Sequence, residues 1–209
     1  MAQKEFDPLG LGYDRRVPRS GAEARQRLQQ AALELYGERG FDGTTTAEIA
    51  ARAGVNHRTF FRHFPDKREV LFDGEAGLRD ALVQAVTDAP HDLLPFEALI
   101  AAFRVAGRIL DENRPFSGPR LEIIAATPAL RERDLAKGAM LARAIAGALR
   151  QRGVPDRLAD LAAQAGWATF HHAAGAWIDD PSHSLDEHLS QAFDELRALS
   201  TIPATGFRP

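Results

Sequence analysis

The chain has 209 residues, of which 44% are hydrophobic and 26% charged, and its formal net charge is -3. These values are typical of a globular protein and exclude a disordered chain, and the length allows one large domain or two small ones. Because there is no cysteine, disulfide bonds, thiolate nucleophiles and cysteine-ligated zinc are excluded, which fits a reducing cytoplasm. Taken alone, the net charge favours no nucleic-acid partner.

Neither a secretory signal nor a membrane span is expected. Residues 1–14 include several charged residues and no apolar core. The longest segment without a charge, Leu161–Ile178, approaches the length of a membrane span, but polar side chains such as Gln164 and His171 interrupt it. It therefore predicts a buried helix, and we expect a cytoplasmic protein without membrane contact.

Helix signals recur along the chain whereas strand signals do not, which predicts an all-α fold. Four positions place a side-chain oxygen acceptor three residues before a glutamate, which is the spacing of a capping box at a helix start. These acceptors are Ser20, Thr45, Asp66 and Ser184. Apolar residues at helical spacing follow each of them, so each predicts a helix.

Four helices are predicted in the N-terminal part of the chain. They cover residues 20–39, a short segment after Thr45, a short segment after Asn56, and residues 66–89. Gly40 is suited to end the first helix, and Pro65 ends the third. The segment Asp88–Pro95, with two prolines and two aspartates, indicates a break between a small head and a larger body.

Five further helices are predicted in the body, which brings the expected total to about nine. They lie near residues 95–113, 119–126, 128–151, 155–179 and 184–199. Pro119, Pro128 and Pro155 each stand where a proline in the first helical turn is tolerated.

The most informative segment is Thr44–Arg68, with the sequence TTTAEIAARAGVNHRTFFRHFPDKR. A small residue followed four positions later by glycine, as at Ala50 and Gly54, suits a helix-turn-helix unit. The helix after Asn56 is too short to be stable alone, so Phe60 and Phe64 are expected to anchor it. Its outer face then carries donors suited to phosphates and base edges, namely His57, Arg58, Thr59 and Arg62.

The run from Gly40 to Leu71, with GFDGTTTAEIAARAGV, NHRTFFRHF and PDKREVL, closely resembles the N-terminal DNA-binding domain of the TetR family of bacterial transcriptional regulators. Counting the first helix, the motif covers about 50 residues, and the rest of the chain matches the family only in its helical pattern and length. The resemblance implies a homodimeric, ligand-responsive regulator, most often a repressor. Its partners would be a palindromic double-stranded DNA operator and an unknown small-molecule effector, with no cofactor.

The resemblance also implies how the chain is divided. Its parts would be a flexible basic arm (1–19), a helix-turn-helix domain (20–65), a connecting helix (66–89), an effector-binding and dimerisation domain (90–200) and a tail (201–209).

Site residues follow from the resemblance position by position. His57 and Arg58 fall at positions that read bases, and Arg58 is the natural partner for a guanine edge. The backbone-contact positions carry Thr45, Thr46, Thr59, His63, and Lys67 at the predicted start of the fourth helix. With Asn56, Phe61 and Arg62 these residues make up the candidate DNA interface. For His63 a purely structural role is the alternative.

Two features of the candidate interface are particular to this sequence. Phe61 stands where the family usually has tyrosine, whose hydroxyl binds a phosphate, so that contact is missing or is replaced by Arg62. The N-terminal arm, with Arg15, Arg16 and Arg19, is suited to a flanking minor groove.

The body carries candidates for an effector pocket and for a dimer interface on helical stripes. The candidate pocket residues are Phe103, Phe116, Ile124, Met140, Trp167, Phe170 and His171. The candidate interface residues are Leu161, Ala165, Ala168, His172, Leu185, Leu189, Phe193 and Leu196, which would form a four-helix bundle between subunits. Ordinary core packing is the alternative for each of them. Arg104 and Arg120 are either partners for an acidic effector group or surface charges.

Other functions have less support. No two of His171, His172, His183 and His188 have the i, i+4 spacing of a zinc helix, so no metal site is expected. The G-x-S-x-G, Walker and G-x-G-x-x-G motifs are missing, so an enzyme is not expected. The alternative that stays open is a helical small-molecule-binding protein or enzyme whose head mediates protein contacts.

The charges are unevenly distributed along the chain. Up to Arg68 there are 12 basic and 9 acidic residues, and after it there are 14 basic and 20 acidic ones. The sequence therefore predicts a basic head on an acidic body, which the net charge conceals.

Overall fold

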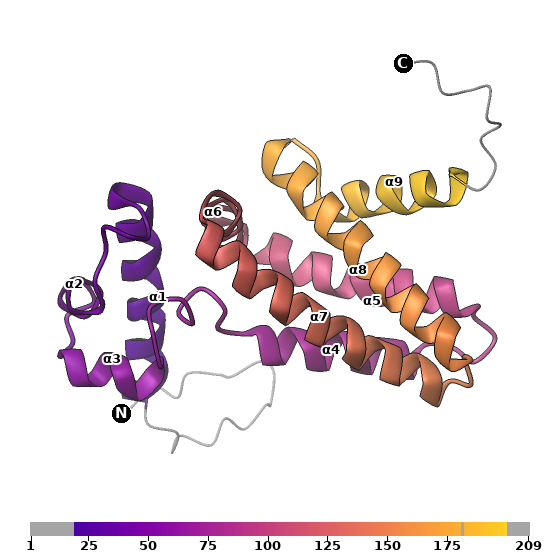
Figure 1. Cartoon of the computed structure of the whole chain (residues 1–209), viewed down its shortest axis with the longest axis horizontal. Coiled ribbons are helices and arrows are strands. Elements are labelled where there is room, and N and C mark those ends of the chain that lie inside the picture. Colours follow the sequence, from indigo (N-terminus) through magenta and orange to yellow (C-terminus); the bar gives the residue numbers. More distant parts are fainter. Residues whose placement is uncertain (1–18, 181, 200–209) are drawn as a thin grey trace, which may run out of the picture.

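The computed structural model describes residues 19–180 and 182–199, and every regular element within these ranges is an α-helix. The nine helices are α1 (Arg19–Arg39), α2 (Thr46–Arg52), α3 (His57–His63), α4 (Glu75–Asp88), α5 (Pro95–Glu112), α6 (Arg114–Ala126), α7 (Pro128–Gln151), α8 (Asp156–Asp179) and α9 (Leu185–Ala198). Figure 1 shows α1, α2 and α3 together at one end of an elongated molecule, with the other helices forming the body. The predicted all-α fold is confirmed. None of the described helices is long and apolar enough to cross a membrane.

Two predicted capping boxes are present in full. At α2, the Thr45 hydroxyl accepts from the Glu48 N–H at 3.2 Å, and the Glu48 carboxylate accepts from the Thr45 N–H at 2.9 Å. Ser184 and Glu187 form the same box at the start of α9. Gly40 adopts a φ of +76°, which ends α1 where the sequence predicted.

The prediction of a helix starting at Asp66 is wrong, because α4 begins only at Glu75. The Asp66 carboxylate does accept from the N–H groups of Arg68 and Glu69, at 2.7 and 3.2 Å. However, the Glu69 carboxylate binds basic side chains of α7 instead of returning to Asp66. Turns continue up to Gly74, whose φ of +88° is incompatible with a helix.

Three other predicted starts are also displaced. Ser20 lies inside α1 rather than ahead of it. Pro119 lies inside α6, because Pro115 already occupies the first turn of that helix and the chain enters the helix at Arg114. Pro155 is the residue that precedes α8, and no side chain caps the start of this helix. The predicted arm up to residue 18 and the predicted tail 201–209 lie outside the described residues.

The described residues form two hydrophobic cores. The core of the head contains Leu28, Ile49 and Phe60, and Ile124 of α6 and Leu130 of α7 reach into it from the body. The core of the body joins α4, α5, α7, α8 and α9. Because α4 contributes buried Leu82 and Val86 to this second core, Asp88–Pro95 is a loop within the body. The turns that follow α3 therefore lie between the two cores, and the predicted domain boundaries stay a prediction.

The close approach of α5 and α8 depends on Gly166, where an added Cβ atom would lie 2.8 Å from Cε2 of Phe103. We expect Gly166→Ala to destabilise the fold by about 1–3 kcal/mol, because the core has no room for the methyl group. Gly175→Ala in the same helix has nothing within 4 Å of its new Cβ and is expected to stabilise by about 0.5–1 kcal/mol. Urea denaturation of both variants checks this, and equal stabilities would contradict the described packing.

Candidate nucleic-acid interface

Helix α3 is fixed to the head by its aromatic side. Phe60 and Phe64 are 0% and 2% exposed, and their ring centroids lie 5.9 Å apart. The turn before α3 depends on Gly54, which has a φ of +66°, and on a hydrogen bond from the Val55 N–H to the Ala50 carbonyl at 2.9 Å. The predicted helix-turn-helix is therefore present, with the anchoring that the sequence indicated.

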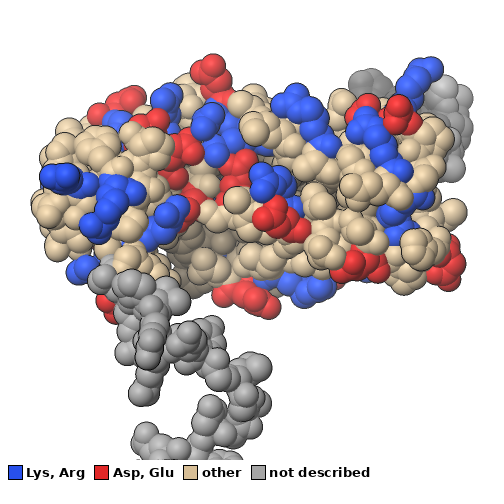
Figure 2. Space-filling view, turned by 90° about the horizontal axis from the view of Figure 1, so that it is seen from below, with Lys and Arg blue, Asp and Glu red and all other residues tan. Residues whose placement is uncertain are grey.

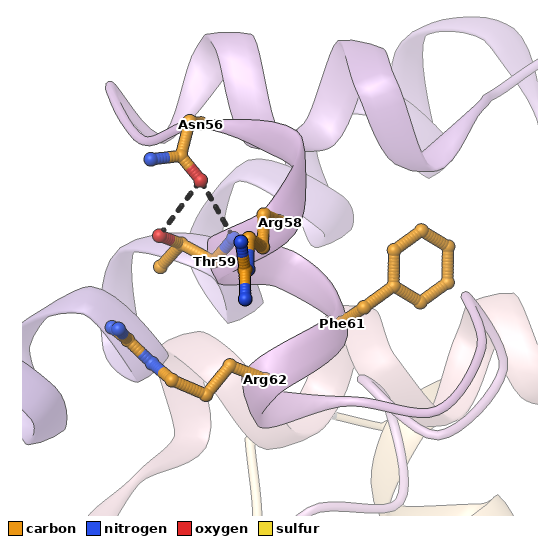
Figure 3. Close-up of a pocket in the computed structure, with 5 residues that line it drawn as sticks. All are labelled: Asn56, Arg58, Thr59, Phe61 and Arg62. Carbon is orange, nitrogen blue, oxygen red and sulfur yellow. Dashed lines mark hydrogen bonds between the residues drawn. The ribbon is translucent and has the colours of Figure 1, made fainter.

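The start of α3 is capped by Asn56. Its Oδ1 atom accepts from the Thr59 N–H at 2.8 Å and from the Thr59 hydroxyl at 3.0 Å (Figure 3). Both side chains are thus held in place before any partner binds. Since Oδ1 is occupied by the cap, the amide NH₂ group of Asn56 is the part that remains as a donor.

Arg58 and Arg62 are exposed on the outer side of α3. Among the described residues, neither of them forms an ion pair or donates a hydrogen bond to the protein. Figure 2, viewed from the side on which α3 lies, shows several basic side chains and few acidic ones on this part of the head. By contrast, Arg52 on the neighbouring helix is paired with Glu34 and Glu38. The two unpaired guanidinium groups leave all their donors available for an anionic partner.

His57 and Phe61 form a second part of this surface. The Nε2 atom of His57 lies 2.8 Å from the Thr46 hydroxyl, so this hydrogen bond joins the starts of α2 and α3. The His57 ring contacts the ring of Phe61 edge-on, at 5.0 Å between centroids. Phe61 is 51% exposed and points away from Arg62 in Figure 3.

The prediction that Lys67 stands at the start of a helix is wrong, because Lys67 lies in the turns before α4. Its ammonium group donates to the carbonyls of Phe41 at 2.8 Å and Thr44 at 2.9 Å, and it lies over the Phe41 ring. Only one of its three N–H donors is left for another partner. Lys67 therefore has a clear structural role in holding the loop before α2.

His63 is half-buried, and no described residue offers a hydrogen bond to its buried Nε2 atom. Burial lowers the pKa of His63, and the positive charges of Arg62 and Arg25 lower it further. This shift favours the neutral form of the ring, and the predicted backbone contact of His63 stays a prediction. Arg15 and Arg16 of the predicted arm lie outside the described residues.

A second candidate site is a cavity of about 240 Å³ in the body. Of the seven predicted pocket residues, Phe116 and Trp167 line it. Phe103 and Phe170 are buried in the core of the body, Ile124 is buried in the core of the head, and Met140 and His171 are exposed. Arg120, one of the two arginines considered for an acidic effector group, also lines the cavity, whereas the other, Arg104, pairs with Asp186. The sequence missed Phe72, Leu78, Ile109 and Leu141, because a helical stripe does not show which apolar side faces a cavity.

The predicted dimer-interface residues divide into two groups. Leu185, Leu189 and Phe193 are buried within the subunit, where Phe193 packs on Phe103 of α5. The prediction that these three residues face a second subunit is therefore wrong. The others remain on the surface of α8 and α9: Leu161, Ala168 and His172 are exposed, and Ala165 and Leu196 are half-buried.

Two of the four histidines considered for a metal site do come together. Asp180, His183 and His188 place ligand atoms within 4.8 Å of one another, a cluster that spacing on one helix could not reveal because His183 lies in a loop. Hydrogen bonds from the Ser182 hydroxyl and between His183 and Asp180 account for this arrangement without an ion. His171 instead lies beside Asp134, with Nε2 at 2.9 Å from Oδ2.

A capped, aromatic-anchored recognition helix with unpaired arginines defines a helix-turn-helix DNA-binding protein. Residues 28–73 match the family model for bacterial regulatory proteins of the tetR family, and residues 93–200 match the model of the MftR C-terminal domain. The chain therefore belongs to the TetR family of transcriptional regulators.

Individual relatives agree with this assignment. MftR of Mycobacterium tuberculosis, whose name assigns it to mycofactocin biosynthesis, is 25% identical over 192 residues, which cover 90% of this chain and 96% of that protein. The regulator TcmR of Streptomyces glaucescens is 37% identical over 105 residues, which cover 50% of this chain and 45% of that protein. This chain thus spans less than half of the length of TcmR.

Solved structures share the fold. SmeT of Stenotrophomonas maltophilia in complex with triclosan has a TM-score of 0.63 at 23% identity, with 89% of this chain and 98% of that chain covered. FadR of Thermus thermophilus in complex with lauroyl-CoA has a TM-score of 0.54 at 26% identity, with 88% and 99% covered.

Phe61→Tyr tests whether the exposed ring at this position faces a phosphate. The new hydroxyl is expected to form a hydrogen bond worth about 1 kcal/mol, so affinity for DNA should rise about fivefold. Because a phosphate contact is independent of sequence, fluorescence anisotropy with a random-sequence duplex at low salt is sufficient. Phe61→Leu is the control and should show no gain; equal affinities for the tyrosine and leucine variants would place the ring away from the backbone.

Proposed function

We propose that the protein is a ligand-responsive repressor that binds a palindromic operator as a homodimer. The observation that carries this proposal is the outer face of α3, where Arg58 and Arg62 are exposed and have no acidic partner among the described residues. If α3 served only to pack the head, its stability would not require two unpaired guanidinium groups on a basic surface.

The contacts with DNA divide by type. Arg58 lies in the first turn of α3, from which side chains of a recognition helix reach base edges, and its guanidinium fits O6 and N7 of guanine. Arg62 lies one turn further on and is suited to the phosphate backbone. Thr45 and Thr46 at the start of α2 add hydroxyl groups near the positive end of that helix.

The surface of α8 and α9 is proposed as the subunit interface. Leu161 is 65% exposed, and a groove formed by Ala168, His172, Leu196 and other residues runs between the two helices. Burial of such an apolar surface against the same surface of a second copy would give a two-fold dimer. The two copies of α3 would then enter successive major grooves about 34–36 Å apart.

The cavity in the body is proposed as the effector site. It lies between the helices of the body and the turn that leads to the head, since Phe72 and Gly74 form part of its wall. SmeT and FadR, which share the fold, have been solved with triclosan and with lauroyl-CoA. An effector that binds one arrangement of head and body more tightly would shift the population toward it. We propose no catalytic step. We also propose a cytoplasmic location, because the protein would have to reach the bacterial DNA.

Operator selection from a random library tests the proposal. The wild type is expected to select a palindrome with salt-sensitive affinity. Arg58→Ala should lose about 1–3 kcal/mol on that palindrome and accept other bases at one position per half-site. The matched control Arg62→Ala should weaken all sequences alike and reduce the salt slope by about one. If no sequence is selected, the repressor proposal is wrong; if both variants behave identically, the assignment of roles is wrong.

Leu161→Arg tests the proposed interface. A charge placed there would be buried without a partner, so we expect monomers in native mass spectrometry and at least about tenfold weaker operator binding. The control Leu135→Arg changes a leucine of α7 that is similarly exposed, at 70%, and should leave a dimer. A dimeric Leu161→Arg protein would place the interface on another face.

A further inference from the structure

The cavity in the body combines an apolar wall with charged groups at one side. Its apolar wall includes Phe72, Leu78, Ile109, Phe116, Leu141 and Trp167. At about 240 Å³ it is smaller than the roughly 300–1,000 Å³ of most ligand pockets, so it suits a small molecule with an apolar body. The charged side chains of the cavity then determine which polar group of such a ligand can bind.

Five ionisable side chains line the cavity, namely Asp73, Glu75, Arg120, Asp134 and Lys137. Each of the three carboxylates has a basic partner. Asp73 forms an ion pair with Arg25 of α1, and Glu75 forms one with Lys137. Oδ2 of Asp134 lies 2.9 Å from Nε2 of His171, and this contact raises the pKa of His171 and so favours its cationic form.

Arg120 is the exception among these five groups. Its guanidinium donates one hydrogen bond, from NH1 to the Leu71 carbonyl at 2.8 Å, and no carboxylate of the described residues forms an ion pair with it. The Arg120 side chain is half-buried in the wall of the cavity, and burial lowers its pKa against the opposing charges of Asp134 and Glu75. A guanidinium has five N–H donors and stays charged in proteins, so most of its binding capacity is unused.

An unpaired, poorly solvated charge is costly, and a ligand of opposite charge removes that cost. The planar guanidinium matches a carboxylate with two parallel hydrogen bonds. A dianion such as a phosphate fits less well, because Asp134 and Glu75 lie close enough to act on Arg120 electrostatically.

We propose that the effector is a small apolar molecule with a single carboxylate group, and that Arg120 pairs with this carboxylate while the aromatic wall holds the apolar part. This inference rests on the proposed function, since it takes the cavity as the effector site. The Arg120 contact with Leu71, which belongs to the core of the head, gives the bound carboxylate a direct connection to the junction with the head.

The test compares probes that share an apolar part and differ in the polar end: phenylacetate, phenylacetamide and phenethylamine, and the same three forms of the octanoyl chain. Thermal shift and calorimetry on the full chain without DNA measure binding. We expect at least one carboxylate to bind about tenfold or more tightly than its own amide and amine. Carboxylates that fail to bind, or that bind no better than the amides, would overturn the inference, and tighter binding of the amines would point to Asp134 instead.

Arg120→Gln keeps a donor for the Leu71 carbonyl but removes the charge, so it should lose the preference for the carboxylate and retain affinity for the amide. Arg114→Gln is the matched control, since Arg114 lies on the same helix and donates to the Trp177 carbonyl at 2.9 Å, outside the cavity. An unchanged carboxylate preference in Arg120→Gln would contradict the proposal. Because these measurements need no DNA, their failure is distinguishable from failure of the repressor proposal, which depends on operator selection.

Discussion

The segment between α3 and α4 connects the head to the body, and side chains from both parts hold it in place. The Tyr36 hydroxyl donates to the Lys67 carbonyl at 2.6 Å, while Lys67 itself holds the loop before α2. From the other side, Arg133 of α7 pairs with Glu69, and Arg120 of α6 binds the Leu71 carbonyl. The orientation of α3 depends on this segment, because it is the covalent path between the recognition helix and the cavity, and it lies against both.

Many basic side chains stabilise the fold through partners within the chain, whereas three arginines at the two candidate sites have no acidic partner among the described residues. Most arginines of the described residues have a carboxylate or a carbonyl as partner, such as Arg52 with Glu38 and Arg152 with the Pro90 carbonyl. Arg58 and Arg62 on α3 lack such partners on an exposed surface, and Arg120 lacks an acidic one beside a cavity. Since a poorly solvated or concentrated positive charge is unfavourable until it is matched, these positions are where anionic partners are expected to bind.

The accuracy of the sequence-based predictions depended on how local each signal was. Thr45 and Ser184 cap helices as predicted, because both partners of a capping box lie within one turn. Asp66 has the same spacing to Glu69, but that glutamate is bound by Arg133 and Lys137, which are distant in sequence. The aromatic residues of the body were similarly ambiguous: Phe103 and Phe116 are both apolar residues on helices, yet only the second faces the cavity.

The sequence alone determined the all-α fold, the helix-turn-helix with Phe60 and Phe64 as its anchors, and the exposed position of Arg58, because local spacing and side-chain chemistry are sufficient for these features. Only the tertiary structure decided that α4 packs in the core of the body and that Leu185, Leu189 and Phe193 of α9 join the same core. It also decided that Arg120 lines a cavity and has no acidic partner among the described residues. These features depend on which side chains meet across long stretches of chain, and the periodicity of a single helix carries no information about its neighbours.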